Sequence, residues 1–209
     1  MHDKLRLVFR RGQNVRYISH LDLLRTFTRA MRRSGLPVKY SEGFNPHPQM
    51  TFALPLSVGV LSECEIVDIS LARDIDLIEE LKNLAVQLPK GLEIVEGYRT
   101  LTKMSEIKTA EYMLKVELEQ PCIREKVIEA VTGFELMAEK VTKKKTEMVN
   151  VLLHLHKFEA NEEMREIKME VSAGNTFNLK PELVLEAISN KVSEFKIVDC
   201  DVTRTRFGY

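Results

Sequence analysis

One helix is marked at both ends by its sequence, and it constrains the fold of the residues around it. Ser19 is suited to cap its start, with Asp22 three residues later as in a capping box, and Gly35 followed by Pro37 ends it. With about 100° of turn per residue, the apolar residues share one side: Leu23, Leu24, Phe27, Ala30 and Met31. A helix with such a side needs a sheet or another helix to cover it.

The segments around this helix have the pattern of strands. Residues 4–11 place Leu5, Leu7 and Phe9 at every second position, which is typical of a half-buried strand. The elements that follow the helix are a short strand, an extended segment, a strand, a helix that Asp74 can cap and a strand, over residues 38–44, 49–58, 63–71, 74–88 and 92–99. The order β-α-β-β-α-β predicts a split-βαβ or ferredoxin-like unit, an antiparallel sheet with two helices on one face.

The same order returns in the second half of the chain. Residues 100–110 are polar and aperiodic, which indicates a linker. Beyond it, Pro121 and Pro181 are each suited to the first position of a helix, and the strands number one more than before. We therefore predict an α+β protein of two tandem ferredoxin-like modules, residues 1–100 and 101–209.

Charge is distributed unevenly along a chain whose formal net charge is zero. Residues 1–50 hold ten Lys or Arg and three Asp or Glu, whereas residues 51–100 hold four basic and nine acidic residues. A local positive excess within a neutral protein favours an anionic partner for one face, unless the oppositely charged segments pack side by side and cancel.

The basic residues of the first helix lie opposite its apolar side, and Asp22 is the acidic residue within that helix. Arginine forks suit phosphate groups, and nearby aromatic rings such as Tyr17 and Tyr40 are candidates for stacking on unpaired bases. A small second basic patch is expected on the last strand, whereas Lys143, Lys144 and Lys145 are expected in a solvated turn. The predicted nucleic-acid-binding residues are Arg10, Arg11, Arg16, Arg25, Arg29, Arg32, Arg33, Phe44, His47, Arg204 and Arg206.

His47 stands between Pro46 and Pro48, on a segment that the prolines hold extended and non-helical. Such a loop is suited to contact a base or a partner, although a rigid crossover with an incidental histidine has the same sequence. His20 and His47 together are a candidate general acid and base for metal-independent RNA cleavage. His154 and His156 have a spacing found in some metal sites, but exposed strand residues are the preferred interpretation.

The cysteines offer no metal-binding spacing. Cys64, Cys122 and Cys200 are far apart in the sequence, which favours reduced thiols over a disulfide framework or a zinc or iron–sulfur site. We expect no metal and no cofactor on this chain. No apolar run approaches the roughly 20 residues that span a bilayer, and the first residues lack the apolar stretch of a secretory signal. We therefore expect a cytoplasmic location.

The run "RYISHLDLLRTFTRAMRRSGLPVKYSEGFNPHPQMTFALPLSVGV", together with "RTRF" near the end, resembles the radical-SAM-linked proteins. This is a bacterial domain of unknown function that occurs alone or fused behind a radical S-adenosylmethionine (SAM) enzyme. The resemblance implies a partner enzyme that carries the iron–sulfur cluster, and RNA-related work in the cytoplasm. The chain lacks the CxxxCxxC of a radical SAM enzyme, so it is not expected to cleave S-adenosylmethionine itself. In the order of its expected helices and strands, but not in its motifs, the chain is also similar to tandem ferredoxin-like CRISPR RNA-processing endonucleases.

Three functions are compatible with these patterns. The first is a non-catalytic RNA-binding or substrate-presenting accessory of a radical SAM enzyme. The second is a metal-independent endoribonuclease that uses His20 and His47. The third is a protein-interaction module whose basic face docks on an acidic partner.

Overall fold

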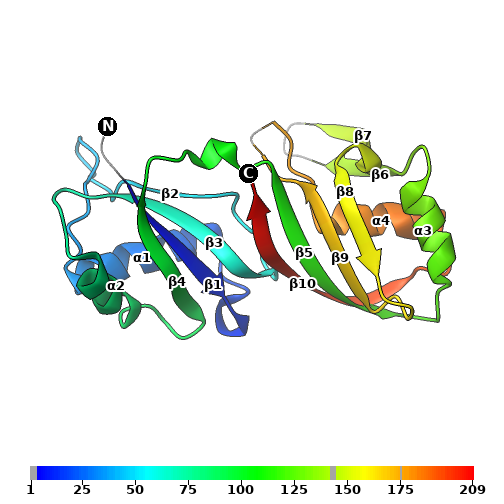
Figure 1. The fold of residues 1–209 in the computed structure, drawn as a ribbon, viewed down its shortest axis with the longest axis horizontal. Helices are drawn as coiled ribbons and strands as arrows, with labels where there is room; N and C mark the ends of the chain where they lie inside the picture. The colour runs from blue at the N-terminus through cyan, green and yellow to red at the C-terminus, as the bar shows by residue number, and fades with distance from the viewer. Residues whose placement is uncertain (1–3, 142–144, 175) are drawn as a thin grey trace. The chain divides into compact units, whose positions relative to one another are not determined.

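The computed structural model describes residues 4–141, 145–174 and 176–209. It divides into two compact units, Met1–Met104 and Ser105–Tyr209, each built from an antiparallel sheet with helices (Figure 1). The predicted α+β class is confirmed. None of the helices in these described ranges is long and apolar enough to cross a membrane. Of the lysine cluster at 143–145, Lys143 and Lys144 lie outside the described residues.

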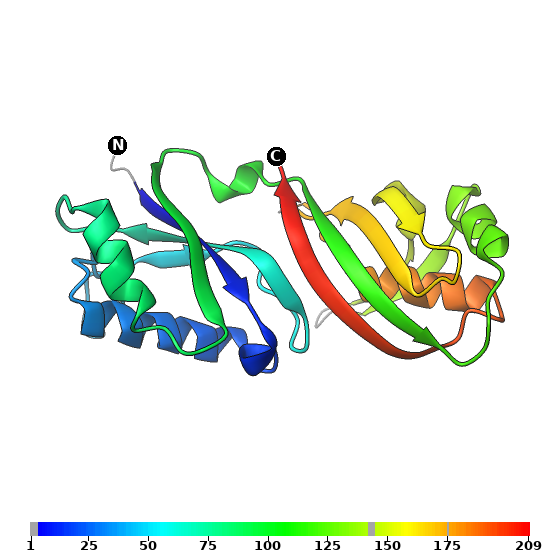
Figure 2. The ribbon, with the colours of Figure 1, turned by 60° about the horizontal axis from the view of Figure 1, so that its bottom comes forward.

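The described residues of unit 1 form four strands in the order β4-β1-β3-β2, and every neighbouring pair is antiparallel. Its elements are β1 (Lys4–Arg11), η1 (Gln13–Val15), α1 (His20–Ser34), β2 (Met50–Phe52), β3 (Leu61–Ser70), α2 (Leu77–Ala85) and β4 (Leu92–Thr100). The alternation of β1 buries Leu5, Leu7 and Phe9 in one core with α1 and α2. The Phe9 and Phe27 rings lie 4.9 Å apart there, centroid to centroid, and α1 runs along the sheet (Figure 2).

Two elements of unit 1 differ from the prediction. Asp76, rather than Asp74, caps α2: its Oδ1 accepts hydrogen bonds from the amides of Ile78 and Glu79, at 3.0 and 3.2 Å. Asp74 instead pairs with Arg99, at 3.4 Å. The short strand expected at 38–44 is reduced to two isolated bridges, and the rest of that segment forms a loop.

The C-terminal end of α1 depends on Gly35, whose φ of 76° is left-handed. We expect Gly35→Ala to lower the free energy of unfolding by about 1–2 kcal/mol, the penalty for a Cβ in this conformation. An added Cβ would have no heavy atom within 4 Å, so the loss comes from the backbone alone. Urea denaturation measures it. Gly35→Asn is the matched control, because asparagine tolerates this conformation, and equal losses for both variants would contradict the explanation.

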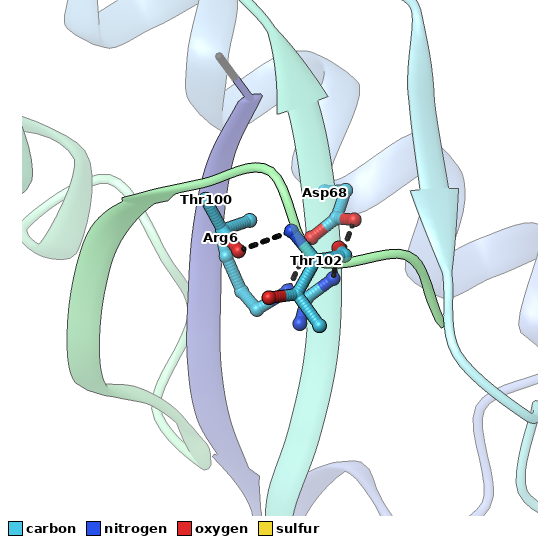
Figure 3. Close-up of polar contacts among 4 residues, drawn as sticks. All are labelled: Arg6, Asp68, Thr100 and Thr102. Atoms are coloured by element: carbon cyan, nitrogen blue, oxygen red, sulfur yellow. Dashed lines mark hydrogen bonds and ion pairs between the residues drawn. The ribbon is translucent and has the colours of Figure 1, made fainter. Parts of the chain in front are cut away.

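On the opposite face of the β1 strand, Arg6 is buried in an ion pair with Asp68 of β3 (Figure 3). Their Nε–Oδ1 and Nη2–Oδ2 distances are 2.7 and 2.9 Å, and the side chains are 1% and 4% exposed. Arg6 Nη2 also donates to the carbonyl of Thr102, at 2.8 Å, while the Thr102 amide donates to Thr100 Oγ1. The guanidinium therefore holds the segment after β4 against the sheet.

The described residues of unit 2 form four antiparallel strands in the order β10-β5-β9-β8, and a separate hairpin of β6 and β7. Its elements are β5 (Thr109–Leu118), α3 (Arg124–Thr132), β6 (Met137–Val141), β7 (Thr146–Asn150), η3 (Val151–Leu153), β8 (Leu155–Ala160), β9 (Glu166–Ser172), α4 (Pro181–Lys191) and β10 (Ile197–Gly208), preceded by η2 (Met104–Glu106). Pro181 opens α4 as predicted, but α3 begins at Arg124 after an extended Ile123, so Pro121 is not its first residue. The β6–β7 hairpin occurs where the sequence predicts one extra strand.

Candidate nucleic-acid interface

The arginines of α1 face away from the core. The buried residues of the helix are Leu23, Phe27, Ala30 and Met31, and all its arginines, Arg25, Arg29, Arg32 and Arg33, are exposed. With 100° per residue, Arg25, Arg29 and Arg32 fall within a sector of about 60° opposite the buried side. We call these three residues the arginine row.

Few of the protein's own groups neutralise the arginine row. Arg25 pairs with Asp22, 3.1 Å from Nη1 to Oδ1, in an exposed i,i+3 contact. The hydrogen bond from the Ser19 hydroxyl, and then Arg25, lower the pKa of Asp22, so this carboxylate is ionised at neutral pH. Within the part of the chain that the structure describes, Arg29 and Arg32 form no hydrogen bond or ion pair through their side chains. Two guanidiniums are therefore available to an external anion.

Arg33 lies to one side of the row and is already engaged. Its Nη2 donates to the Gln87 carbonyl at 2.6 Å, and its Nε donates to Gln87 Oε1 at 3.1 Å. Gln87 follows α2, so this contact joins the ends of the two helices. Arg33 keeps an exposed surface but has fewer donors for a phosphate than Arg29 or Arg32.

The basic residues at the turn between β1 and α1 differ in exposure and in the groups that they bind. Arg10 is exposed, with a 3.9 Å contact to Glu93. Arg16 is half-buried and donates to the Gly59 carbonyl through Nε and Nη2, at 3.0 and 2.8 Å. The prediction for Arg11 is wrong: its side chain is 2% exposed, and its guanidinium binds backbone carbonyls of the turn. Inward alternation along β1 places it inside.

The loop 41–47 presents the predicted aromatic and imidazole groups. Phe44 is fully exposed at the loop, which Gly43 helps to turn with a φ of 119°. Ser41 closes the loop, because its amide donates to the His47 carbonyl and its Oγ accepts from the His47 amide, at 2.9 and 3.1 Å. The same Oγ lies 2.9 Å from Nδ1 of the His47 ring. Pro48 is buried at the base of the loop and anchors its exposed tip.

The loop and the turn lie at opposite ends of α1. The turn follows Arg11, the last residue of β1, whose Nη2 reaches the carbonyl of Ile18 just before α1. Past the other end of α1, the Lys39 amide donates to the carbonyl of Ser70, which pairs with Lys4 at the start of β1. The helix is about 22 Å long, at 1.5 Å per residue. The arginine row therefore leads from the turn toward the loop.

His20 and His47 are not brought together. The His20 ring packs edge-on against Phe52 of β2, with centroids 5.5 Å apart. His47 is held by Ser41 in the loop past the C-terminal end of α1, whereas His20 is the first residue of that helix, which is about 22 Å long. Proton transfer needs hydrogen-bond reach or one bridging water. A joint acid–base role for the two imidazoles therefore has no geometric support.

Of the two basic residues predicted on the last strand of unit 2, one is exposed and the other is buried. Arg206 is exposed on β10. Arg204 is 2% exposed and its guanidinium carbon lies 4.5 Å from the centroid of the Phe207 ring. The prediction that Arg204 contacts nucleic acid is therefore corrected, because a packed guanidinium presents no surface to a ligand. Its neighbour Arg206 alone remains from that predicted patch.

His154 and His156 both contact one hydroxyl. His154 Nδ1 and His156 Nε2 lie 3.4 and 2.9 Å from Ser172 Oγ. The His154 ring stacks on Phe177, 3.6 Å between centroids, and the Lys140 ammonium lies 3.6 Å from the centroid of that same Phe177 ring. Over the described ranges, no three His, Cys, Asp or Glu side chains are placed to hold a metal ion.

Protonation of His154 is expected to destabilise the fold. Burial, and then the charges of Lys140 and His156, lower the pKa of His154 below 6.5. As the pH falls below about 6.5, the unfolded chain takes up a proton before the folded chain does, so the free energy of unfolding decreases until the folded pKa is passed. His154→Phe keeps an aromatic ring against Phe177 without this titration. Denaturation curves at pH 7.5 and 5.0 should show a smaller loss for the variant, and an equal loss would contradict the assignment.

The cysteines, which all lie in described ranges, form no disulfide. Burial, and then the charge of Glu182, raise the pKa of Cys200 to about 11. Burial also raises the pKa of Cys122. Thiols with raised pKa are poor nucleophiles at neutral pH, so neither is a candidate catalytic group.

Comparison with known proteins places the chain in a family. A family model described as "Uncharacterized protein conserved in bacteria (DUF2344)" matches residues 4–181. The chain belongs to the DUF2344 family. No curated protein matches it.

Among solved structures, the DUF2344 chain is similar to one from the "Crystal Structure of a Cbf5-Nop10-Gar1 Complex", with a TM-score of 0.50 and 13% sequence identity. The match covers 99% of this chain and 49% of that one, so this chain spans about half the length of the matched chain. At this identity the likeness concerns the fold, which it supports as α+β. An unknown protein from Galdieria sulphuraria matches at a TM-score of 0.31 and 12% identity, covering 97% and 98% of the two chains.

Sequence reasoning missed the residues that hold the DUF2344 loop and turn in place. Ser41 was not singled out, although a serine before a Gly-containing loop is the residue type that bonds nearby backbone groups. The Gly59 carbonyl binds Arg16, and its backbone φ of 90° is left-handed. No sequence signal indicates the partner of this carbonyl.

Proposed function

We propose that this protein is an RNA-binding module in which the arginine row contacts phosphates and the loop 41–47 contacts a base. The observation that carries the proposal is the row itself: three exposed guanidiniums in one sector, of which only Arg25 pairs with a carboxylate, Asp22, among the residues that the structure describes. Such a surface repels itself unless an anion meets it. Phosphates spaced along a strand are suited to a row of planar arginine forks.

Phe44 and His47 support the base contact. Phe44 exposes its whole ring from a loop that is closed by Ser41 and anchored by a buried proline. An ordered loop loses little entropy on binding, and an exposed ring can stack on a base whatever the base is. The loop therefore suits a sequence-tolerant contact at the end of the row.

The experiment is a titration of fluorescein-labelled single-stranded RNA of mixed sequence with the full chain, at 50 to 200 mM KCl. Neutralising three phosphates should give a slope of about −2 in log K against log salt, at about 0.7 per phosphate. An acidic polyglutamate competitor of equal charge tests the alternative of an acidic protein partner. RNA binding that is absent at 50 mM KCl, or displaced equally well by polyglutamate, would overturn the proposal.

We further propose that each unit is a split-βαβ module. In unit 1 the order β4-β1-β3-β2, with α1 after β1 and α2 after β3, supports this assignment. In unit 2 the order β10-β5-β9-β8 supports it once the β6–β7 hairpin is regarded as an insertion.

The resemblance to radical-SAM-linked proteins supports a role beside a radical SAM enzyme, which would use the bound RNA as its substrate. The cysteines of this chain have no cluster-binding spacing, so the partner would supply the iron–sulfur cluster. Anaerobic affinity purification from a bacterial host should retain a brown iron–sulfur protein. A preparation without bound iron or sulfide would contradict this part of the proposal.

A further inference from the structure

Tyr17 exposes 72% of its surface between η1 and α1. A single exposed tyrosine is ordinary on a protein surface, so exposure alone does not indicate a site. What distinguishes Tyr17 is the backbone around it, the cation beside its ring and its place just before the helix that carries the arginine row.

The backbone on both sides of Tyr17 is held by buried contacts. The Arg11 guanidinium donates to the carbonyls of Val15, Arg16 and Ile18, at 3.3, 2.9 and 2.7 Å. Because Arg11 comes from β1 and is itself buried, it fixes this turn to the sheet. A ring presented from a fixed backbone has only two side-chain torsions to lose on binding, so the entropic cost is small.

A cation and a loop edge adjoin the Tyr17 ring. The Arg16 guanidinium carbon lies 5.2 Å from the ring centroid, within the range of a cation–π contact. Arg16 is held in turn by the Gly59 carbonyl, and the Gly59 amide donates to the Arg16 carbonyl at 2.9 Å. A Cβ on Gly59 would lie 3.8 Å from Tyr17 Cε1, so this loop lies against the ring edge. The ring is therefore positioned from two sides while most of it stays in solvent.

The arginine row begins in the second turn of the helix that follows Tyr17. Leu21, which is 62% exposed, lies one helical turn before Arg25. Measured around the helix axis, it is within about 80° of every member of the row. Tyr17 precedes the helix by three residues. An aromatic group followed by guanidiniums along about 10 Å of helix, from Arg25 to Arg32 at 1.5 Å per residue, matches the two parts of a single-stranded nucleic acid, unpaired bases and a continuous phosphate backbone.

We infer that Tyr17 stacks on an unpaired base and that unit 1 therefore selects single-stranded over duplex RNA. The inference rests on the proposed RNA binding. In a duplex the bases are stacked on one another and their faces are closed to the ring, so a duplex can use only the arginine row. A strand with unpaired bases uses both.

The test compares Tyr17→Ala and Tyr17→Phe with the unchanged chain, using a single-stranded RNA 12-mer and a duplex of the same sequence. Tyr17→Ala should weaken single-strand binding about 10-fold, leave its salt slope unchanged and leave duplex binding unchanged. Tyr17→Phe should bind as the unchanged chain does. Circular dichroism melting shows whether each variant is folded.

A second readout uses the absence of tryptophan from the sequence. The variant Tyr17→Trp carries a single indole at this site, whose fluorescence should be quenched by the single-stranded RNA and not by the duplex. If the unchanged chain binds no RNA, the proposed function fails. If it binds RNA with the expected salt slope, but Tyr17→Ala binds equally well and Tyr17→Trp is not quenched, the stacking inference alone is overturned.

Discussion

Asp68→Ala is expected to lower the free energy of unfolding by about 3–5 kcal/mol, the cost of leaving a buried charge without its partner. In the folded protein the Arg6 guanidinium is 1% exposed and receives two of its hydrogen-bond acceptors from Asp68. Removal of the carboxylate takes away an anion that pairs with this buried cation, whereas the Thr102 carbonyl that stays in place is a neutral acceptor. Urea denaturation followed by circular dichroism measures the loss, at a fixed pH near 7.

Two further variants make this prediction specific. Arg6→Met combined with Asp68→Leu should recover most of the loss, because apolar residues of similar volume often replace a buried ion pair without penalty. Arg10 lies on β1, as Arg6 does, but its ion pair with Glu93, 3.9 Å between Nη1 and Oε2, is exposed. Glu93→Ala should therefore change the free energy of unfolding by less than about 1 kcal/mol. A double variant as unstable as Asp68→Ala would show that packing at this site, rather than the unpaired charge, is responsible.

Replacement of Arg25, Arg29 and Arg32 by glutamine is expected to weaken RNA binding about 100-fold at 100 mM salt, taking about 1 kcal/mol for each charged contact. The salt slope should also fall by about 2, at 0.7 per phosphate. These side chains are exposed, so the fold should be retained. Fluorescence anisotropy over a range of KCl concentrations measures both quantities in the same titration.

A matched variant shows whether the loss of RNA affinity comes from the arginine row itself or from the lower net charge. Lys108, Lys115 and Lys180 are exposed in unit 2, and their replacement by glutamine removes the same amount of positive charge. This control should lose only a few-fold in affinity. Equal losses for the two triple variants would show that RNA responds to the overall charge, and the arginine row would then not be the binding surface.

The parts of unit 1 that could be predicted from the sequence are those that local patterns determine. Ser19 and Gly35 delimit α1 as expected, and the alternation of Leu5, Leu7 and Phe9 identifies the buried side of β1. Apolar periodicity and cap residues act over a few residues, so they can be interpreted without knowledge of the tertiary structure.

The roles of individual arginines could not be predicted in this way. Arg11 and Arg29 are equally basic in the sequence, yet one is buried under a turn and the other is free in the described structure. The alternation of β1 indicates the buried side for Arg11, but the carbonyls that bind its guanidinium adopt their positions only when the turn forms. Arg204 was misassigned for a similar reason, because its burial depends on tertiary packing rather than on strand alternation alone.

The Ser41 hydroxyl determines more than the closure of its loop. Its oxygen accepts the His47 amide hydrogen and faces Nδ1 of the same residue, so the position of its single proton selects between the two neutral forms of the imidazole. If the hydroxyl donates to Nδ1, Nε2 carries the ring hydrogen and offers a donor to a ligand. If Nδ1 carries the hydrogen, Nε2 offers a lone pair, which suits a ribose hydroxyl. The chemical preference of the loop tip is thus linked to two neighbours of Nδ1, the Ser41 hydroxyl at 2.9 Å and the Asn45 carbonyl at 3.4 Å.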